Sequence, residues 1–477
     1  MSVDWLAKDE NLCAAMQLAK GDEHWNELLC PPRTLDPARC EDLPQVMCPG
    51  LYQATLSGSI ERIYELLGRK DEIAPINEAS HDVKVMLEME DTPPNQLGGK
   101  FHGDGLCTLR EVTAGKNTML HIAAEQGHVE LAKQLIRMDN TLFISENSRH
   151  ETPLHLAARA GNNGIISLIV LLAQQSLTRG AFEVLGRRNT DGDTVLHEAA
   201  RNGHVETVQV LMTVAPALSA KVNNASISPL YLAVVKKSVG VVEALLKYKD
   251  ASAAGPKKQN ALHAAVLGSK ELTSKLLDWR PELAYERDDD SGSTPLHYAA
   301  SDGDVVIVKE ILGKAPSAVY ILDKEGWSPL HVAARMCHYS TIELMIETCS
   351  DSVELRDNQG RNFLHIVALH GGRISSFLRN VLYHLGPKNL AKPGKKIFSE
   401  ACWLAANGKK INYLKKIVNE RDNEGNTPLH CASMNGSSDI IRELIKVGAD
   451  KTLINNEGKT ALDYSISQKS VFSMVIY

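Results

Sequence analysis

The sequence predicts an all-α solenoid of stacked helix–turn–helix units that are joined by hairpin-like finger loops. Three observations predict this architecture. A short motif close to TPLHxAA recurs along the chain, its copies follow one another at a period of about 33 residues, and the residues that begin and end helices recur in phase with it. Such a period is typical of arrays in which each unit buries the apolar face of its neighbour.

The repeated motif has ten clear copies. In chain order they are NTMLHIAAEQGH, ETPLHLAARAGN, DTVLHEAARNGH, ISPLYLAVVKKS, QNALHAAVLGSK, STPLHYAASDGD, WSPLHVAARMCH, RNFLHIVALHGG, NTPLHCASMNGS and KTALDYSISQKS. The second residue of each copy stands at 118, 152, 194, 228, 260, 294, 328, 362, 427 and 460. The interval of 42 residues holds an insertion around QQSLTRGAFEVLG, and the interval of 65 hides a worn copy that starts at Ala401. Another worn copy starts at Leu51.

The elements of one unit follow from its residues, as the copy at 152 shows. Thr152 is a favourable N-cap, and Pro153 suits the first helical position, where the N–H needs no partner. Small alanines in the first helix let neighbouring helices approach, and Gly161 supplies the left-handed residue that ends it. A second amphipathic helix follows, as in HVETVQVLM of the next unit, and turns such as DKEGWS lead onward with Gly where φ must be positive.

These elements divide the chain into six predicted regions. They are a weakly structured N-terminal extension (1–48), a degenerate repeat (49–68), an inserted loop (69–115), the main repeat array (116–386), a lysine-rich segment with a degenerate repeat (387–425) and C-terminal repeats (426–477).

Composition narrows the classes of function. The net charge of −6 gives no reason to expect a nucleic-acid partner. The N-terminus is charged throughout and unlike a secretory leader, and the nine cysteines form no C-x-x-C pair, so we expect a reducing, cytoplasmic location. Cys30, Cys40 and Cys48 lie close in sequence, but their irregular spacing favours incidental thiols over a metal knuckle. The longest apolar run, 165–173, is about half a membrane span.

One stretch comes near to a catalytic motif. HEAAR at residues 197–201 lacks the second histidine of the zinc-binding H-E-x-x-H helix and has Arg201 in its place, a cation that would repel zinc. Phosphate-binding, nucleophile-elbow and dinucleotide-binding motifs are also absent from the sequence. We therefore predict a protein that is not an enzyme and has no catalytic residues, no metal, no cofactor and no small-molecule substrate.

The T-P-L-H-x-A pattern resembles the ankyrin repeat. The resemblance implies an ankyrin-repeat solenoid, in which the histidine near the start of each first helix forms hydrogen bonds between the turn and the neighbouring repeat. The matching histidines are His121, His155, His197, His263, His297, His331, His365 and His430. Tyr231 and Asp463 replace the histidine in two copies, so we expect those junctions to be weaker or terminal.

Longer stretches resemble plant ankyrin proteins of the accelerated-cell-death type. These are MCPGLYQATLSGSIERIYELLG, DKEGWSPLHVAAR and DNQGRNFLHIVALHGG. The resemblance implies a role in plant defence and salicylic-acid-linked cell death. Relatives in that family carry a C-terminal PGG-motif segment with membrane helices, but this sequence stops at SVFSMVIY, where that segment would begin. We therefore assign the membrane anchoring to the relatives alone.

The leading hypothesis for function is a protein–protein interaction scaffold. Such arrays present an extended concave surface, and tryptophan and arginine are the side chains that most often anchor a partner. Two sets of positions are expected to face the concavity: the residue before each N-cap, at a finger tip, and the residue that follows Ala-Ala in the first helix. They give Trp327, Arg335, Arg361, Arg159, Arg201, Asp193 and Asn426 as candidate partner-binding residues. Packing of Trp327 against a neighbouring finger is an equal alternative.

A second hypothesis rests on a lysine-rich segment at 387–418. It carries eight lysines with Glu400 as the opposing charge. Such a cluster could contact an anionic membrane, and the protein would then regulate a channel or receptor from the cytosolic face of the plasma membrane. A solvated insertion around a worn repeat is the alternative that we favour, because charge runs usually face water.

Overall fold

The computed structural model describes residues 46–69, 107–175, 184–370 and 414–467. The chain divides into the units Met1–Val46 and Met47–Tyr477, and the description that follows concerns the second unit. The described residues are helical and contain no strand, and isolated antiparallel bridges join Ala254 to Asn260 and Ile454 to Thr460. The predicted all-α class is confirmed.

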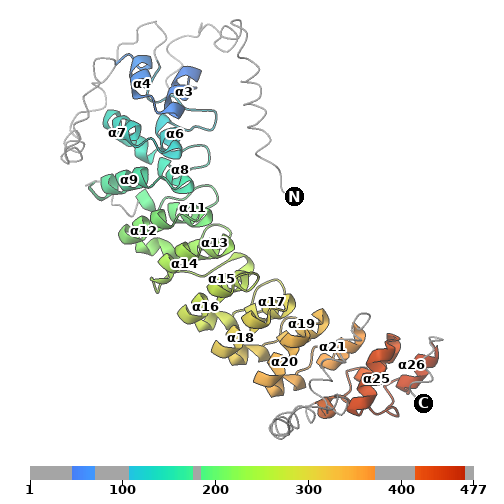
Figure 1. Cartoon of the computed structure of the whole chain (residues 1–477). Helices are drawn as coiled ribbons and strands as arrows, with labels where there is room; N and C mark the ends of the chain where they lie inside the picture. Colours follow the sequence, from blue (N-terminus) through green and yellow to red (C-terminus); the bar gives the residue numbers. More distant parts are fainter. Residues whose placement is uncertain (1–45, 70–106, 176–183, 371–413, 468–477) are drawn as a thin grey trace, which may run out of the picture. The chain divides into compact units, whose positions relative to one another are not determined.

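Helices alternate between two rows (Figure 1). The first helices of the repeats are α3 (Pro49–Ser57), α6 (Met119–Gln126), α8 (Pro153–Ala160), α11 (Val195–Asn202), α13 (Pro229–Val235), α15 (Ala261–Ala265), α17 (Pro295–Asp302), α19 (Pro329–Met336), α21 (Phe363–Leu369), α24 (Pro428–Met434) and α26 (Ala461–Ser467). The second helices are α4 (Ile60–Leu66), α7 (Val129–Met138), α9 (Asn163–Gln175), α12 (Val205–Val214), α14 (Val239–Leu246), α16 (Lys270–Trp279), α18 (Val305–Lys314), α20 (Tyr339–Thr348) and α25 (Ser438–Val447).

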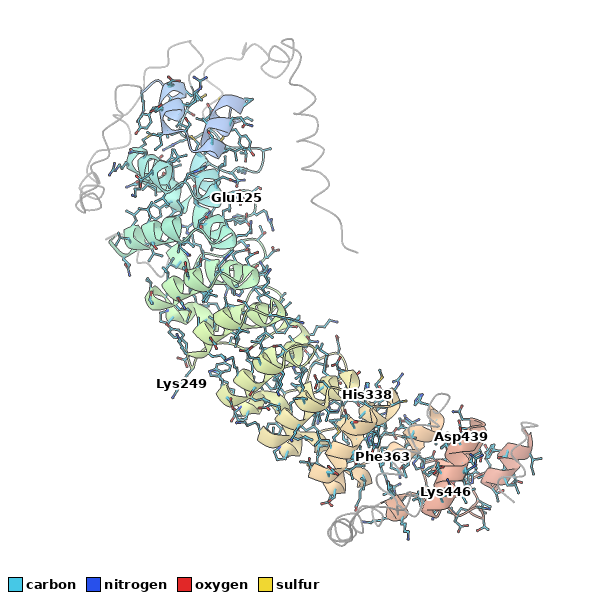
Figure 2. All side chains as sticks on the ribbon, in the orientation of Figure 1. Glu125, Lys249, His338, Phe363, Asp439 and Lys446 are labelled. Atoms are coloured by element: carbon cyan, nitrogen blue, oxygen red, sulfur yellow. The ribbon has the colours of Figure 1, made fainter. Side chains whose placement is uncertain are left out.

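Each helix packs on its own repeat and on its neighbours in the same row. The first helices contact one another in succession from α3 through α26, and the second helices do so from α7 through α20. The core is therefore continuous along the array, and the leucine of each TPLH motif lies in it, as Leu154, Leu296 and Leu330 do with no exposed surface. Phe363, at the start of α21, is the largest fully buried side chain (Figure 2).

The first helices begin with the predicted N-cap residue, and the histidine three residues later adds a hydrogen bond to it. Thr152 is the N-cap of α8, Pro153 is the first helical residue, and the imidazole of His155 accepts the N–H of Thr152 at 3.1 Å. The histidine thus fills the part that Glu or Gln has in a capping box. The same reciprocal cap occurs in α6, α11, α15, α17, α19, α21 and α24.

The prediction that glycine ends the first helices is confirmed, most clearly at Gly161. Gly161 ends α8 with φ 78°, and a Cβ at this position would lie 2.5 Å from Nδ1 of His204. A side chain is therefore excluded there both by the backbone conformation and by space. In the repeat of Trp327 a cysteine takes this role, since Cys337 ends α19 with φ 63°.

Two features of the connections refine the sequence prediction. Short 3-10 helices follow several second helices, as at Pro216–Ala220, Pro281–Tyr285 and Pro316–Tyr320, where proline fixes φ at the first position. The finger loops then stack on one another through backbone hydrogen bonds. The N–H of Lys324 donates to the carbonyl of Ser291 at 2.9 Å, and that of Asn423 donates to Gln359 at 2.9 Å.

Several sequence predictions fall on residues outside this description. They concern the extension before residue 46, most of the inserted loop, the insertion at 176–183, and the lysine-rich segment up to residue 413. Within the described residues, no helix combines the length and the apolar character needed to cross a membrane.

Candidate partner-binding surface

A ladder of buried histidines links each repeat to the next. Nε2 of His121 lies 2.9 Å from the carbonyl oxygen of Glu151, and Nε2 of His197 lies 3.1 Å from that of Ile227. In both cases the acceptor is the residue before the next N-cap. The same contact is made by His155, His263, His297, His331, His365 and His430.

Burial keeps this ladder neutral. Desolvation lowers the pKa to about 4 in His121, His197, His297, His331 and His365. Each ring uses Nδ1 as the acceptor for its N-cap, so Nε2 carries the proton and donates to the next repeat. His197 therefore has both nitrogens engaged in the scaffold.

The two repeats without this histidine differ from each other. Tyr231 donates its hydroxyl to Oε1 of Gln259 at 3.0 Å and so still joins its repeat to the next. Asp463 accepts the backbone N–H and the hydroxyl of Thr460, its own N-cap, at 2.7 and 2.8 Å. Within the described residues Asp463 thus caps its own helix, whereas Tyr231 joins its repeat to the next, and the expected weakness of both junctions stays a prediction.

Arginines at the ends of α8 and α11 belong to an internal ion network. Nε of Arg159 lies 3.1 Å from Oε2 of Glu198, and NH1 of Arg201 lies 3.1 Å from Oε1 of the same carboxylate. Arg159 also pairs with Glu151, and Arg201 with Asp193. The three carboxylates are at most 3% exposed at their side chains, against 32% and 40% for the two guanidiniums. Each arginine therefore covers buried negative charge.

Two of the expected finger tips are placed differently from the prediction. The side chain of Asp193 is completely buried and accepts the amide of Asn223 at 2.8 Å. Asn426 is 3% exposed and accepts the amide of Asn455 at 2.9 Å. The residue before the N-cap therefore does not always project, because the next finger stacks over it. The binding roles assigned to these two residues stay predictions.

Trp327 also precedes an N-cap, and the exposed side chain of Arg335 stacks on its ring. Trp327 is half-buried, and its backbone N–H and carbonyl bond to Asp323 and His297 at 2.7 and 2.9 Å. The guanidinium carbon of Arg335, which is exposed, lies 5.0 Å from the centroid of the Trp327 ring. This is the geometry of a cation–π pair. Stacking orients the guanidinium, and in the described ranges no carboxylate pairs with its N–H donors.

Arg361 continues this surface on the next finger. Its Nε donates to Oδ2 of Asp357 at 2.7 Å, its NH2 donates to Gln359 at 3.0 Å, and its side chain is 22% exposed. Burial lowers the pKa of His370, and the positive charges of Arg335 and Arg361 lower it further, so both arginines lie near His370. We refer to Trp327, Arg335, Arg361 and His370 as the Trp327 patch.

Between these two regions lies a hydrogen-bond chain that contains no arginine and that the sequence did not single out. Gln259 accepts from Tyr231 and donates to the hydroxyl of Tyr298 at 3.0 Å, which donates to Asp288 at 2.8 Å. Gln259 is the residue before the N-cap Asn260, and this position in the repeat is the feature of the sequence that could have identified it. The arginine network, the hydrogen-bond chain through Gln259 and the Trp327 patch thus follow one another along the first helices.

Comparison with known families agrees with this geometry. A model of three-copy ankyrin repeats matches residues 101–179, 172–254 and 401–476, a many-copy model matches 283–333, and a single-repeat model matches 325–358. The chain belongs to the ankyrin-repeat family. Ankyrin arrays are typically binding modules rather than catalysts, so the array is a scaffold for protein–protein interaction.

Individual relatives cover part of the chain. Protein ACCELERATED CELL DEATH 6 of Arabidopsis thaliana is 30% identical over 266 residues, which are 49% of this chain and 39% of that protein, and this confirms the resemblance seen in the sequence. Transient receptor potential cation channel subfamily A member 1 of Homo sapiens is 28% identical over 42% of this chain and 18% of its own length. Each match thus spans well under half of the relative.

A solved structure of the same repeat type is also similar. The crystal structure of the ankyrin repeat domain of Bcl-3 is 22% identical, with a TM-score of 0.36, and the match covers 60% of this chain and 98% of that domain.

Proposed function

We propose that this ankyrin array binds a protein partner through its concave face, with the Trp327 patch as the anchor for a partner segment that carries acidic side chains. The observation that supports the proposal is the state of Arg335. It is exposed, it is oriented by the Trp327 ring, and no carboxylate of the described residues pairs with it. A guanidinium with free donors recognises a carboxylate through two parallel hydrogen bonds.

Charge and residue type both favour an acidic segment. The charge comes from the two arginines, because the lowered pKa of His370 leaves its ring neutral near pH 7. Arg361 retains exposed surface although it contacts Asp357. Arginine and tryptophan are also the residues whose truncation costs most at protein interfaces. Arg159 and Arg201 fit an anchoring role less well, because three buried carboxylates already accept their donors.

The biological setting that we propose is defence or cell-death signalling in a plant. Its support is the similarity to the Arabidopsis protein, whose name refers to accelerated cell death. In this setting the chain would be a scaffold without catalytic activity, and its specificity would come from the side chains along the first helices.

Peptide selection on the full chain tests the proposal. Peptides selected from a random display library should be enriched in Asp and Glu, and combined alanine substitution of Trp327, Arg335 and Arg361 should weaken their binding at least about tenfold. Ser301→Ala is the matched control, because Ser301 is exposed at the position of Arg335 one repeat earlier. Neutral peptides, or acidic peptides that bind the triple variant as well as the parent, would place the anchor elsewhere.

A second candidate function is regulation of a channel or receptor at the cytosolic face of a membrane. Two observations favour it: the lysine-rich segment 387–418, and the similarity to cation channels of the transient receptor potential type in Homo sapiens and Caenorhabditis elegans. In the described part of that segment, Lys415 is exposed and Lys416 pairs with Glu354 at 2.5 Å.

Liposome flotation separates this candidate from the first. Binding to vesicles with anionic lipid, but not to neutral vesicles, would support it, because each basic side chain at such a surface contributes about 1 kcal/mol. Charge reversal at Lys388, Lys392, Lys395 and Lys396 should then abolish flotation, whereas flotation with neither kind of vesicle would exclude the candidate.

A further inference from the structure

Two cysteines meet at the N-terminal end of the described array. Cys48 is the N-cap of α3, and its Sγ accepts the backbone N–H of Leu51 at 3.3 Å. Cys107 lies 59 residues further along the chain, and its Sγ is 2.8 Å from that of Cys48. Both side chains are half-buried, so a small reagent can reach them. The sequence spacing had grouped Cys48 with Cys30 and Cys40 instead, which lie outside the described residues.

Backbone contacts hold the two cysteines in register. The N–H of Cys107 donates to the carbonyl of Leu66 at 3.1 Å, and the N–H of Met47 donates to Val112 at 2.8 Å. The carboxylate of Glu111, which is 6% exposed, accepts the N–H of Cys48 with one oxygen and the N–H of Thr108 with the other, both at 3.0 Å. The pair is thus positioned by backbone hydrogen bonds and by the buried Glu111 side chain rather than by chance contact of surface side chains.

The two thiols have different chemical environments. Cys48 is the N-cap of a nine-residue helix, and its Sγ accepts a backbone N–H at the start of that helix. Burial, the hydrogen bond to Cys48 and the nearby charge of Glu111 raise the pKa of Cys107 to about 12. Cys107 therefore keeps its proton, and the Sγ of Cys48, which already accepts a backbone N–H, is the sulfur that we expect to react first.

A metal ion fits this cluster less well than a cross-link. Cys48, Cys107 and Glu111 could offer three ligands within 4.8 Å of one another. However, both oxygens of Glu111 already accept backbone N–H bonds, and a structural zinc site in proteins takes about four ligands.

We propose that Cys48 and Cys107 form a reversible disulfide by exchange with a small-molecule disulfide, and that this bond fastens the segment 107–112 to the start of α3. The thiolate of Cys48 attacks one sulfur of glutathione disulfide and expels one glutathione thiolate. Cys107 then gives its proton to that glutathione thiolate and attacks the sulfur of Cys48, which expels the second glutathione, and this takes up the proton that Cys48 had released. The two protein thiols are oxidised by two electrons in total, and one glutathione disulfide is reduced to two glutathiones.

The bond would act on the first junction of the stack. α3 packs on both α4 and α6, so a cross-link at its N-cap restrains the end of the array from which the core continues. Closing a loop of this length mainly restricts the unfolded chain. Oxidation would therefore suppress local opening of the first repeat and leave distant repeats unaffected, since coupling in such arrays runs between neighbours.

Mass mapping of the full chain tests the proposal. After equilibration with glutathione disulfide and glutathione, digestion should yield a peptide pair joined through Cys48 and Cys107, and excess reduced glutathione should remove it. In Cys107→Ser, Cys48 should accumulate as the mixed disulfide with glutathione. Cys48→Ser should form neither product, and it keeps the cap because serine is a favourable N-cap. Cys337→Ser is the control, since Cys337 is equally accessible and should not change the cross-link.

Hydrogen exchange measures the consequence for the fold. Oxidation should slow amide exchange in α3 and α4 by about tenfold or more, with α19 unchanged. Absence of the joined peptide, equal modification of Cys337, or one bound zinc ion per chain that is lost in Cys107→Ser would each overturn the proposal.

Discussion

Three repeats have an arginine at the same position near the end of the first helix, but its contacts differ between two regions. The first region contains Arg159 and Arg201, and the second contains Arg335. In the first region the residue eight positions earlier is Glu151 or Asp193, and each arginine pairs with it. In the second region that residue is Trp327, and Arg335 stacks on its ring. The residue before the N-cap thus decides whether the arginine forms an ion pair within the array or stacks on an aromatic ring.

The comparison shows why residue type and register are insufficient to assign a binding role. A buried carboxylate needs a charged partner, because an unpaired charge away from water is costly. Arg159 and Arg201 meet that need, and Glu198 between them uses both of its oxygens. An indole ring carries no charge that needs a partner, and within the described part of the chain no carboxylate pairs with Arg335. The predictions below test this contrast from the largest expected effect to the smallest.

Acidification should weaken both regions alike, because the histidine ladder runs through them. The folded pKa of about 4 in five ladder histidines lies below the unfolded value of 6.5. The unfolded chain therefore takes up protons first, and the stability present above pH 6.5 is lost as the pH falls toward 4. Urea unfolding at pH 5.5 should show an array less stable than at pH 7 by up to about 6 kcal/mol. Equal urea midpoints at pH 5.5 and pH 7 would contradict the assignment of these histidines as buried and neutral.

Truncation of the core between the two regions should separate them. Leu296 is fully buried in α17, so Leu296→Ala should cost about 2–5 kcal/mol. Because only neighbouring repeats are coupled, hydrogen exchange should then show the two flanking blocks unfolding independently. Ser301→Ala, at an exposed position of the same helix, is the control. A single unchanged unfolding transition would show that Leu296 does not carry the junction.

Removal of one charge should reveal the network of the first region. Glu198→Gln keeps the shape of the side chain but removes the carboxylate that joins Arg159 to Arg201, and it should cost about 1–3 kcal/mol in urea unfolding. The exposed pair of Glu243 with Lys275 supplies the control, since Glu243→Gln should leave the midpoint unchanged. Equal effects of the two substitutions would mean that burial of Glu198 adds nothing.

Conversion of one region into the other should change binding more than stability. Trp327→Glu places a carboxylate eight residues before Arg335, as in the first region. The new ion pair should occupy the guanidinium and lower the affinity for an acidic peptide about tenfold, or about 1.4 kcal/mol. Unfolding should shift by about as much as in Trp327→Ala, because both substitutions remove the half-buried indole and an ion pair near the surface adds little. An unchanged affinity, measured by calorimetry, would contradict the role given to free donors.

The periodic parts of the fold could be predicted from the sequence. Contacts that depend on residues distant in the chain could not. Thr152, Pro153 and Gly161 act locally, so their roles in starting and ending α8 could be predicted from residue type alone. The burial of Asp193 could not, because it depends on the next finger stacking above it. The contact between Cys48 and Cys107 joins residues 59 positions apart outside the repeat register, and no periodic signal points to it.

The measurement that tests the contrast most directly compares Arg335→Ala with Arg159→Ala in two assays, the affinity for a selected acidic peptide and the urea unfolding midpoint. Arg335→Ala should weaken binding at least about tenfold and leave the midpoint nearly unchanged. Arg159→Ala should leave binding unchanged and lower the midpoint, because it strands buried carboxylates of Glu151 and Glu198. If Arg159→Ala abolished binding while Arg335→Ala reduced only stability, the assignment of scaffold and binding surface would be reversed.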